Sequence, residues 1–162
     1  MIGARPEFAA GAVRLRPGTG HDLDQVMRIM NAAFPPTFGE AWTRSQCAGI
    51  LPMAGVELIL AEKGRACVGF SLARSITEEA ELLLIAVDPA AQRQGVGAAL
   101  LTQFIAATRA AGCHRLHLEV RDGNPAVALY RSAGFVLGGR RRDYYCGLNG
   151  DRHDALTLVL AD

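Results

Sequence analysis

Two stretches of the sequence combine residue types that bind anions and move protons. The first, "AVDPAAQRQGVGAALL" (residues 86–101), places Arg93, Gly95 and Gly97 between an apolar run and a helical pattern. Glycines at a helix start leave backbone N–H groups open to a ligand, the helix dipole adds positive charge, and arginine can bind phosphate oxygens with two hydrogen bonds. The pattern indicates a phosphate- or pyrophosphate-binding turn. A plain strand-to-helix turn that needs two glycines for its backbone is the alternative.

Two common nucleotide-binding loops do not fit this stretch. A Walker loop would need Gly-Lys followed by Ser or Thr, and no such sequence follows Gly97. A dinucleotide fingerprint would need a glycine where Leu100 stands. The turn is therefore expected to bind an anion in some other structural context.

The second stretch, "RLHLEVRDGNPAVALYRSAGF" (residues 115–135), contains the candidate proton-transfer groups. Glu119 lies at the end of an apolar strand pattern, where a carboxylate can act as a general base, or can form a structural salt bridge with Arg121 or another arginine. His117 alternates onto the same face and is a rival base or an orienting partner. Tyr130 can act as a general acid, or can simply pack against Phe135.

The elements that position these residues follow from hydrophobic periodicity and from turn residues. Strands are expected over residues 12–17, in a hairpin over 56–76, and over 80–89, 115–120, 135–145 and 154–160. Helices are expected over 20–34, 41–51, 96–112 and 125–134. The strand over 80–89 is apolar on both faces and is therefore expected to be central. Runs of strands with interleaved helices predict one α/β or α+β domain over residues 1–162.

Composition excludes several classes of protein. Half of the 162 residues are hydrophobic and 20% are charged, as in globular proteins, and the formal net charge of +1 gives no general attraction to nucleic acid. No apolar run reaches the ~18 residues of a membrane span, and the first residues show no apolar core of a leader peptide. Cys47, Cys67, Cys113 and Cys146 have no metal-binding spacing. We expect a cytoplasmic protein with reduced thiols, no metal, and neither nucleic acid nor membrane as a partner.

The motifs together resemble the GNAT superfamily of acyl-CoA-dependent N-acetyltransferases. "QRQGVGAALL" resembles the superfamily's Q/R-x-x-G-x-G/A segment, and "GCHRLHLEVRDGNPAVALYRSAGF" resembles the strand and helix that follow it. "AFPPTFGEAW" and "RRRDYY" are similar to segments of the RimI type, the ribosomal-protein-alanine N-acetyltransferases. The resemblance is strongest over residues 81–145, which it identifies as the acetyl-CoA core.

The resemblance implies a mixed, twisted, mostly antiparallel sheet of about seven strands, with splayed central strands and about four flanking helices. Acetyl-CoA would lie in the gap as co-substrate, with Glu119 as catalytic base and Tyr130 as catalytic acid. The residues implied to bind acetyl-CoA are Ile85, Ala86, Val87, Arg93, Gln94, Gly95, Val96, Gly97, Ala98 and Asn124. Asn124 is only six positions before Tyr130, where RimI-type sequences have seven, so its contact departs from the family pattern.

The implied activity is acetyl transfer from acetyl-CoA to an amine by direct attack in a ternary complex, since no placed cysteine nucleophile is evident. An α-amine, with a pKa of ~8, loses its proton more easily than a lysine at ~10.4. The expected acceptor is therefore the N-terminus of a protein or peptide, such as a ribosomal protein. A small-molecule amine acetyltransferase and a non-catalytic acyl-CoA-binding module are the alternatives.

Overall fold

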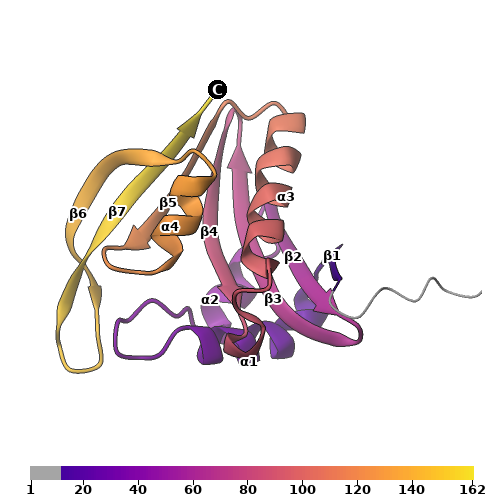
Figure 1. Cartoon of the computed structure of the whole chain (residues 1–162), viewed down its shortest axis with the longest axis horizontal. Helices are drawn as coiled ribbons and strands as arrows, with labels where there is room; N and C mark the ends of the chain where they lie inside the picture. The colour runs from indigo at the N-terminus through magenta and orange to yellow at the C-terminus, as the bar shows by residue number, and fades with distance from the viewer. Residues whose placement is uncertain (1–11) are drawn as a thin grey trace, which may run out of the picture.

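The computed structural model describes residues 12–162, so the expectation about a leader peptide falls largely outside the described residues. The elements in chain order are β1 (Val13–Pro17), the 3-10 turn η1 (Gly20–Asp22), α1 (Leu23–Ala33), α2 (Arg44–Ile50), β2 (Val56–Lys63), β3 (Ala66–Ile76), β4 (Glu79–Val87), the 3-10 turn η2 (Pro89–Ala91), α3 (Val96–Ala110), β5 (Arg115–Arg121), α4 (Ala126–Ser132), β6 (Val136–Cys146) and β7 (Arg152–Ala161). Within residues 12–162 the predicted seven strands and four α-helices are confirmed (Figure 1).

One sheet contains all seven strands, in the order β1-β2-β3-β4-β5-β7-β6. Every neighbouring pair is antiparallel except β4 and β5, which run parallel and are joined by the crossover through α3. β4 is the middle strand of the seven, as its apolar pattern predicts. The sheet is therefore mixed and mostly antiparallel.

The two central strands separate part of the way along their length. β4 pairs with β5 from Glu79 to Leu82 and no further. At the same point the register between β3 and β4 shifts, since Leu72 faces Leu84 and Ala73 faces Leu82, which leaves Leu83 as the extra residue of a β-bulge. A bulge bends its strand, and Figure 1 shows β4 and β5 diverging beyond it. The remainder of β4 therefore has no strand partner on the side of β5.

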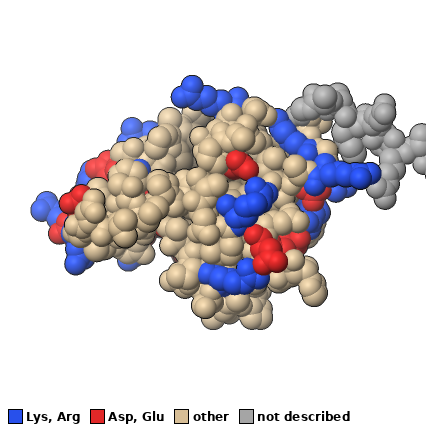
Figure 2. Space-filling view, turned by 90° about the horizontal axis from the view of Figure 1, so that it is seen from below, with Lys and Arg blue, Asp and Glu red and all other residues tan. Residues whose placement is uncertain are grey.

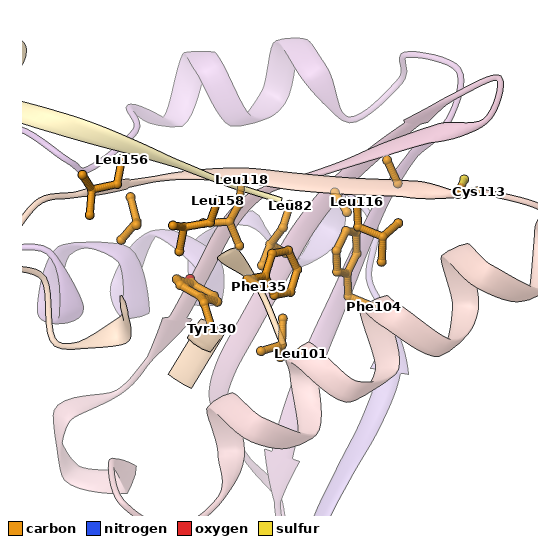
Figure 3. Packing of buried hydrophobic residues seen from close by; sticks show 13 residues of the cluster. Leu82, Leu101, Phe104, Cys113, Leu116, Leu118, Tyr130, Phe135, Leu156 and Leu158 are labelled. Carbon is orange, nitrogen blue, oxygen red and sulfur yellow. The ribbon is translucent and has the colours of Figure 1, made fainter. Parts of the chain in front are cut away.

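Helices cover the two faces of the sheet unequally. α3 and α4 pack on one face, where Figure 3 shows Leu101, Phe104 and Tyr130 beneath side chains from β4, β5 and β7. α1 and α2 pack on the other face, against β2, β3 and part of β4, through a second cluster that includes Val26, Ile29 and Met30 on the predicted apolar face of α1. Among residues 12–162, no helix covers the half of this second face that belongs to β5, β7 and β6 (Figure 1).

Three further findings concern the expected absences. In residues 12–162 no helix is long and apolar enough to cross a membrane. The four cysteines are all free thiols, of which only Cys146 is exposed. Within the same described range, no three His, Cys, Asp or Glu side chains gather in a way that could hold a metal ion.

Candidate active site

A cleft of about 780 Å³ passes through the sheet where β4 and β5 diverge. Its walls come from β4, β5, α4, the first turn of α3 with the loop before it, the loop after α1, and the bend of β6. Volumes of this size are typical of sites for small molecules and cofactors. The site therefore lies at the point where the bulge in β4 ends the pairing between the two strands.

One end of the cleft is formed by β4 and the glycine-containing turn. Five of the residues predicted to bind acetyl-CoA line it: Ile85, Ala86, Val87, Arg93 and Gly97. Arg93 is exposed and has a backbone φ of 61°, in the left-handed region that non-glycine residues seldom adopt. Such conformations persist only where the surrounding structure imposes them, and they gather at ligand sites.

The two glycines of the turn serve different purposes. Gly95 is the N-cap of α3 with a φ of 81°, so it supplies the left-handed backbone that lets the helix begin there. A Cβ on Gly97 would lie 3.2 Å from Leu129 Cδ2 and 3.8 Å from Val87 Cγ2. Gly97 therefore lets the start of α3 approach α4 and β4 closely. The turn therefore meets a packing need, and its role in anion binding stays a prediction.

Four predicted contacts lie away from the cleft wall: Gly95, described above, and Gln94, Val96 and Ala98. The Gln94 side chain accepts a hydrogen bond from Lys63 Nζ and donates one to the Ala90 carbonyl at 3.4 Å. The Val96 side chain is buried in the core, and Ala98 is exposed on α3. What Val96 and Ala98 can offer a ligand is their backbone N–H groups, which lie in the first turn of α3 and have no partner within the helix.

Glu119, the predicted base, lines the cleft and carries an arginine partner. Its carboxylate lies 2.8 Å from Arg141 Nε, and its side chain is 15% exposed. The predicted alternative of a salt bridge is thus present, but the partner comes from β6 instead of being the neighbouring Arg121. The carboxylate is both paired and accessible from the cleft, so its role as base stays a prediction.

Tyr130, the predicted acid, also lines the cleft from its place in the core. The residue is 5% exposed and its ring meets Phe135 edge to face, with centroids 6.1 Å apart (Figure 3). Burial raises the pKa of the Tyr130 phenol, and the nearby Tyr145 and Glu40 raise it further. The packing alternative and a position at the cleft therefore hold together, and the phenol keeps its proton at neutral pH.

A buried ion pair connects the loop after α1 to the end of β5. Arg121 Nε lies 2.5 Å from Glu40 Oε1, and each side chain is 9% exposed. The Arg121 guanidinium also stacks over the Phe38 ring, 3.6 Å from its centroid. Asn124 donates from Nδ2 to the same Glu40 oxygen at 3.3 Å and accepts from the Ala126 N–H at 2.9 Å. Asn124 lines the cleft, but its amide is occupied within the protein.

Two tyrosines of β6 line the cleft next to this loop. Tyr144 and Tyr145 line the cleft with their rings edge to face, 4.9 Å between centroids. Burial raises the pKa of both phenols, and the negative charge of Glu119 contributes at Tyr144. Asp143, with a φ of 53°, turns β6 at this point and its N–H donates to Asp154 at 3.0 Å. Both phenols are therefore neutral hydrogen-bonding groups at neutral pH.

The two candidate proton-transfer groups reach the cleft from opposite faces of the sheet. Leu118 and Val120 belong to the core beneath α3 and α4, so Glu119 between them points to the face without a helix. Tyr130 belongs to the core on the α3 and α4 side (Figure 3). A reacting group in the gap between β4 and β5 would therefore have a carboxylate on one side and a phenol on the other.

The arginines of "GRRRDYY" are largely matched by acidic partners. Arg140 Nη1 lies 2.7 Å from Asp122 and 2.9 Å from Asp154, and Arg141 pairs with Glu119. On the face seen in Figure 2, basic and acidic side chains lie next to one another at the end formed by β6 and β7. This agrees with the interpretation of the segment as a solvated strand.

Sequence reasoning missed three charged residues in or beside the cleft. Glu40 and Glu81 line the wall, and Arg141 pairs with Glu119 from outside the lining. The signal that singled out Glu119, a carboxylate within an apolar strand pattern, is equally present at Glu81 in "AELLLIAV". The partners of Glu40 and Glu119 are 81 and 22 positions away, and no local pattern indicates them.

Comparison with known proteins places this site in context. A family model described as the Acetyltransferase (GNAT) family matches residues 23–135. The [ribosomal protein bS18]-alanine N-acetyltransferase of Escherichia coli K12 is 45% identical over 92 residues, 56% of this chain and 62% of that protein. The N-alpha-acetyltransferase RimI of Mycobacterium tuberculosis is 41% identical over 90 residues, 52% of this chain and 55% of that protein. These alignments span less than two thirds of either relative.

Solved structures extend the likeness over nearly the whole chain. The ribosomal-protein-S18-alanine N-acetyltransferase from Escherichia coli superposes with a TM-score of 0.84 at 31% identity, covering 93% of this chain and 94% of that one. Arabidopsis thaliana NAA60, in complex with a bisubstrate analogue, has a TM-score of 0.78 at 18% identity and shares the fold, covering 93% and 98% of the two chains. With a family model matching more than half of its length, the chain belongs to the acetyltransferase (GNAT) family.

Proposed function

We propose that residues 1–162 form one cytoplasmic N-acetyltransferase domain that transfers acetyl from acetyl-CoA to the N-terminal α-amine of a protein or peptide. One observation carries the proposal: a cleft passes through the sheet between β4 and β5, with Glu119 on one face and Tyr130 on the other. Acyl transfer to an amine needs a base for the amine and an acid for the leaving group. The cleft offers both, on opposite sides of one gap.

The residues at the first end of the cleft fit acetyl-CoA. The part of β4 beyond Leu82 has a free edge that can pair with an extended amide-containing chain such as the pantetheine arm. The first turn of α3, with Arg93 beside it, offers unpaired N–H groups and a cation to a diphosphate. A Cβ at Gly95 would have no atom within 4 Å, so the space beside this residue is open. When bound, acetyl-CoA supplies an activated thioester.

Glu119 is the base in this proposal. Its carboxylate accepts one proton from the acceptor's ammonium group, which leaves a neutral amine with a free electron pair. The amine then attacks the thioester carbonyl directly, so that the C–N bond forms and the C–S bond breaks. No cysteine lines the cleft among the described residues, in keeping with direct attack without an acyl-enzyme.

Tyr130 is the acid. Its phenol donates a proton to the departing sulfur, and the second proton of the attacking nitrogen restores the phenol through solvent. Burial raises the pKa of Tyr130, which keeps the proton available until a thiolate develops beside it. The position of Tyr130 on the α3 and α4 side matches the side on which the glycine turn would hold the rest of the cofactor.

Two lines of support favour a peptide N-terminus as acceptor. The relative with 45% identity is a ribosomal-protein-alanine N-acetyltransferase by name. In this chain the acceptor end of the cleft is bounded by the loop after α1 and by Tyr144 and Tyr145, whose neutral phenols suit an extended peptide backbone. A small-molecule amine acetyltransferase would use the same chemistry, whereas a non-catalytic acyl-CoA-binding module would not need both Glu119 and Tyr130.

An acceptor screen tests the proposal. Peptides that begin with alanine or serine and contain one internal lysine are incubated with acetyl-CoA beside polyamines and free amino acids, with thiol release and mass spectrometry as readouts. We expect thiol release that depends on the peptide, and acetyl on its first residue. Acetyl confined to internal lysines or to small amines would contradict the acceptor class. Acetyl-CoA binding without turnover on any acceptor would support a binding module.

A further inference from the structure

One carboxylate of the cleft has no arginine partner. Three glutamates line the cleft: Glu40, Glu81 and Glu119. Glu40 is paired with Arg121 and Glu119 with Arg141, at 2.5 and 2.8 Å. Within the described residues, the ionic contact of Glu81 is His117 Nε2 at 3.8 Å, which is too long for a hydrogen bond. The Glu81 carboxylate, with 39% of its side chain exposed, is thus free to bind a cation.

Glu81 lies on the same face of the sheet as Glu119. Figure 3 shows Leu82 and Leu118 pointing toward the α3 and α4 side, so Glu81 and Glu119, their neighbours in sequence, point to the opposite face. In the parallel pairing Glu81 stands beside His117, two residues before Glu119 on β5. Two residues along a strand span about 6.6 Å and neighbouring strands lie about 4.8 Å apart, so both carboxylates can reach one small group.

Tyr144 lines the same cleft as the two carboxylates, at the acceptor end. Burial is the largest cause of the raised pKa of Tyr144, and the negative charges of both Glu119 and Glu81 raise it further, while Arg141 opposes them. The fields of the two carboxylates therefore overlap where Tyr144 lines the cleft. The charged side chains that face this region are Glu81 of β4, His117 and Glu119 of β5, Arg141 of β6, and Arg74 of β3, which stands opposite Glu81 in the register but forms no ion pair with it. On β7, Thr157 stands opposite Glu119.

We propose that Glu81 binds the acceptor's ammonium group and holds it for deprotonation by Glu119, an inference that rests on the proposed function. An acceptor amine arrives with a positive charge, and Glu119 is already matched by Arg141. Glu81 supplies the missing negative charge and accepts one N–H of the ammonium, while Glu119 takes the proton. Once the amine is neutral its attraction to Glu81 falls, which releases the nitrogen for attack.

Calorimetry on the protein saturated with CoA tests this role without turnover. The ligands are an alanine-initiated peptide with a free N-terminus and the same peptide with its N-terminus formylated, which removes the charge. The proteins are the wild type, Glu81→Gln and Glu79→Gln. Glu79 is a matched control because it lies on the same strand and the same face, is exposed, and does not line the cleft. Thermal unfolding verifies that each variant is folded.

We expect only Glu81→Gln to lose the preference for the peptide with a charged N-terminus over the formylated peptide. The wild type and Glu79→Gln should bind the free peptide about five- to tenfold more tightly than the formylated one, as for a partly exposed ion pair. Glu81→Gln should reduce that ratio to below about twofold while leaving the affinity for the formylated peptide unchanged. In turnover assays Glu81→Gln should raise the KM for the peptide with little change in kcat.

Two outcomes would overturn the role of Glu81. One is an unchanged ratio in Glu81→Gln. The other is a loss of kcat at constant KM, which would make Glu81 a base instead of a binding group. Failure of the proposed function looks different, because the wild type would then acetylate no peptide N-terminus. In that case the affinities of the wild type and Glu81→Gln are compared for the small amine found in the acceptor screen and for the neutral amide of that amine. The same affinity ratio in both proteins would again overturn the role of Glu81.

Discussion

Among single changes in the acceptor half of the cleft, Glu40→Gln is expected to cause one of the largest losses in the free energy of unfolding. Glu40 balances the charge of Arg121, and each of the two side chains is only 9% exposed. Glutamine keeps the shape and can still accept a hydrogen bond, but it leaves the guanidinium charge buried without a counter-ion. The Phe38 ring, 3.6 Å from the guanidinium carbon, offers only its π face in compensation.

The size of the effect follows from this burial. Breaking a buried ion pair by neutralising one partner typically costs about 3–5 kcal/mol, because the remaining charge stays desolvated. Folded domains are stable by only about 5–15 kcal/mol in total. For a domain of this length, each kcal/mol corresponds to a change of about 2–4 °C in Tm, so the expected fall is roughly 6–20 °C.

The assay is urea unfolding of four proteins: the wild type, Glu40→Gln, Arg121→Met, and the double replacement Glu40→Leu with Arg121→Met. The single changes should each lower the free energy of unfolding by several kcal/mol. The double replacement should recover most of the loss, because apolar side chains of similar volume can replace a buried ion pair with little net effect. The KM for the peptide should rise in Glu40→Gln, since the loop that carries Glu40 lines the cleft.

The reasoning is refuted by either of two results. The first is a loss of less than about 1 kcal/mol in Glu40→Gln, which is the range of an exposed pair. The second is a double replacement as unstable as the single changes, which would mean that the Arg121 contacts to Phe38 and to the Asp122 carbonyl, rather than its charge balance, hold the loop in place.

Three further changes have defined outcomes. Gly97→Val should weaken acetyl-CoA binding measured by calorimetry, because even a Cβ there lies 3.2 Å from Leu129, and an unchanged affinity in a folded variant would remove the turn from the site. Glu119→Gln should lower kcat about 10²–10⁴-fold with acetyl-CoA affinity kept, and Tyr130→Phe should slow transfer without unfolding. A hydrogen bond from Arg16 lowers the pKa of Asp22 in the folded protein, so ionised Asp22 stabilises the fold above about pH 4 and this contribution is lost as the pH falls. In urea titrations at acid pH, Asp22→Asn should therefore make the free energy of unfolding fall less steeply with decreasing pH.

Much of the fold could be predicted from local patterns. Each helix and strand was indicated by its own periodicity and end signals, such as Gly112 with its φ of 91° after α3. The central place of β4 followed from its apolar residues on both faces. The bulge at Leu83 was not indicated, because "LLL" reads as an unbroken strand and the register shift depends on pairing with β3. Yet this bulge lies where the cleft opens.

The site was predictable in its positions and not in its partners. Glu119, Tyr130 and Arg93 could be singled out as candidates from their local patterns, and all three line the cleft. Their roles came from the family resemblance and stay predictions. The pairing of Glu119 with Arg141 could not be foreseen, since it depends on β6 joining the sheet beyond β7. Asn124 shows the same limit: the family resemblance implied a cofactor contact although its spacing departs from the family pattern, and the hydrogen bonds of its amide to Glu40 and to the start of α4 were not indicated by the sequence.

The division of the site between two faces has a mechanistic consequence. A sheet with continuous pairing would keep the α3 side and the open side apart, so a base on one face could not act on a group bound at the other. The end of pairing at Leu82 removes that barrier at one place only. In the proposed reaction, the apolar side keeps the Tyr130 phenol protonated for the leaving sulfur. The open side would give the acceptor a path to Glu119 and its proton a path to solvent. Direct transfer between two bound substrates is the reaction that such a passage suits.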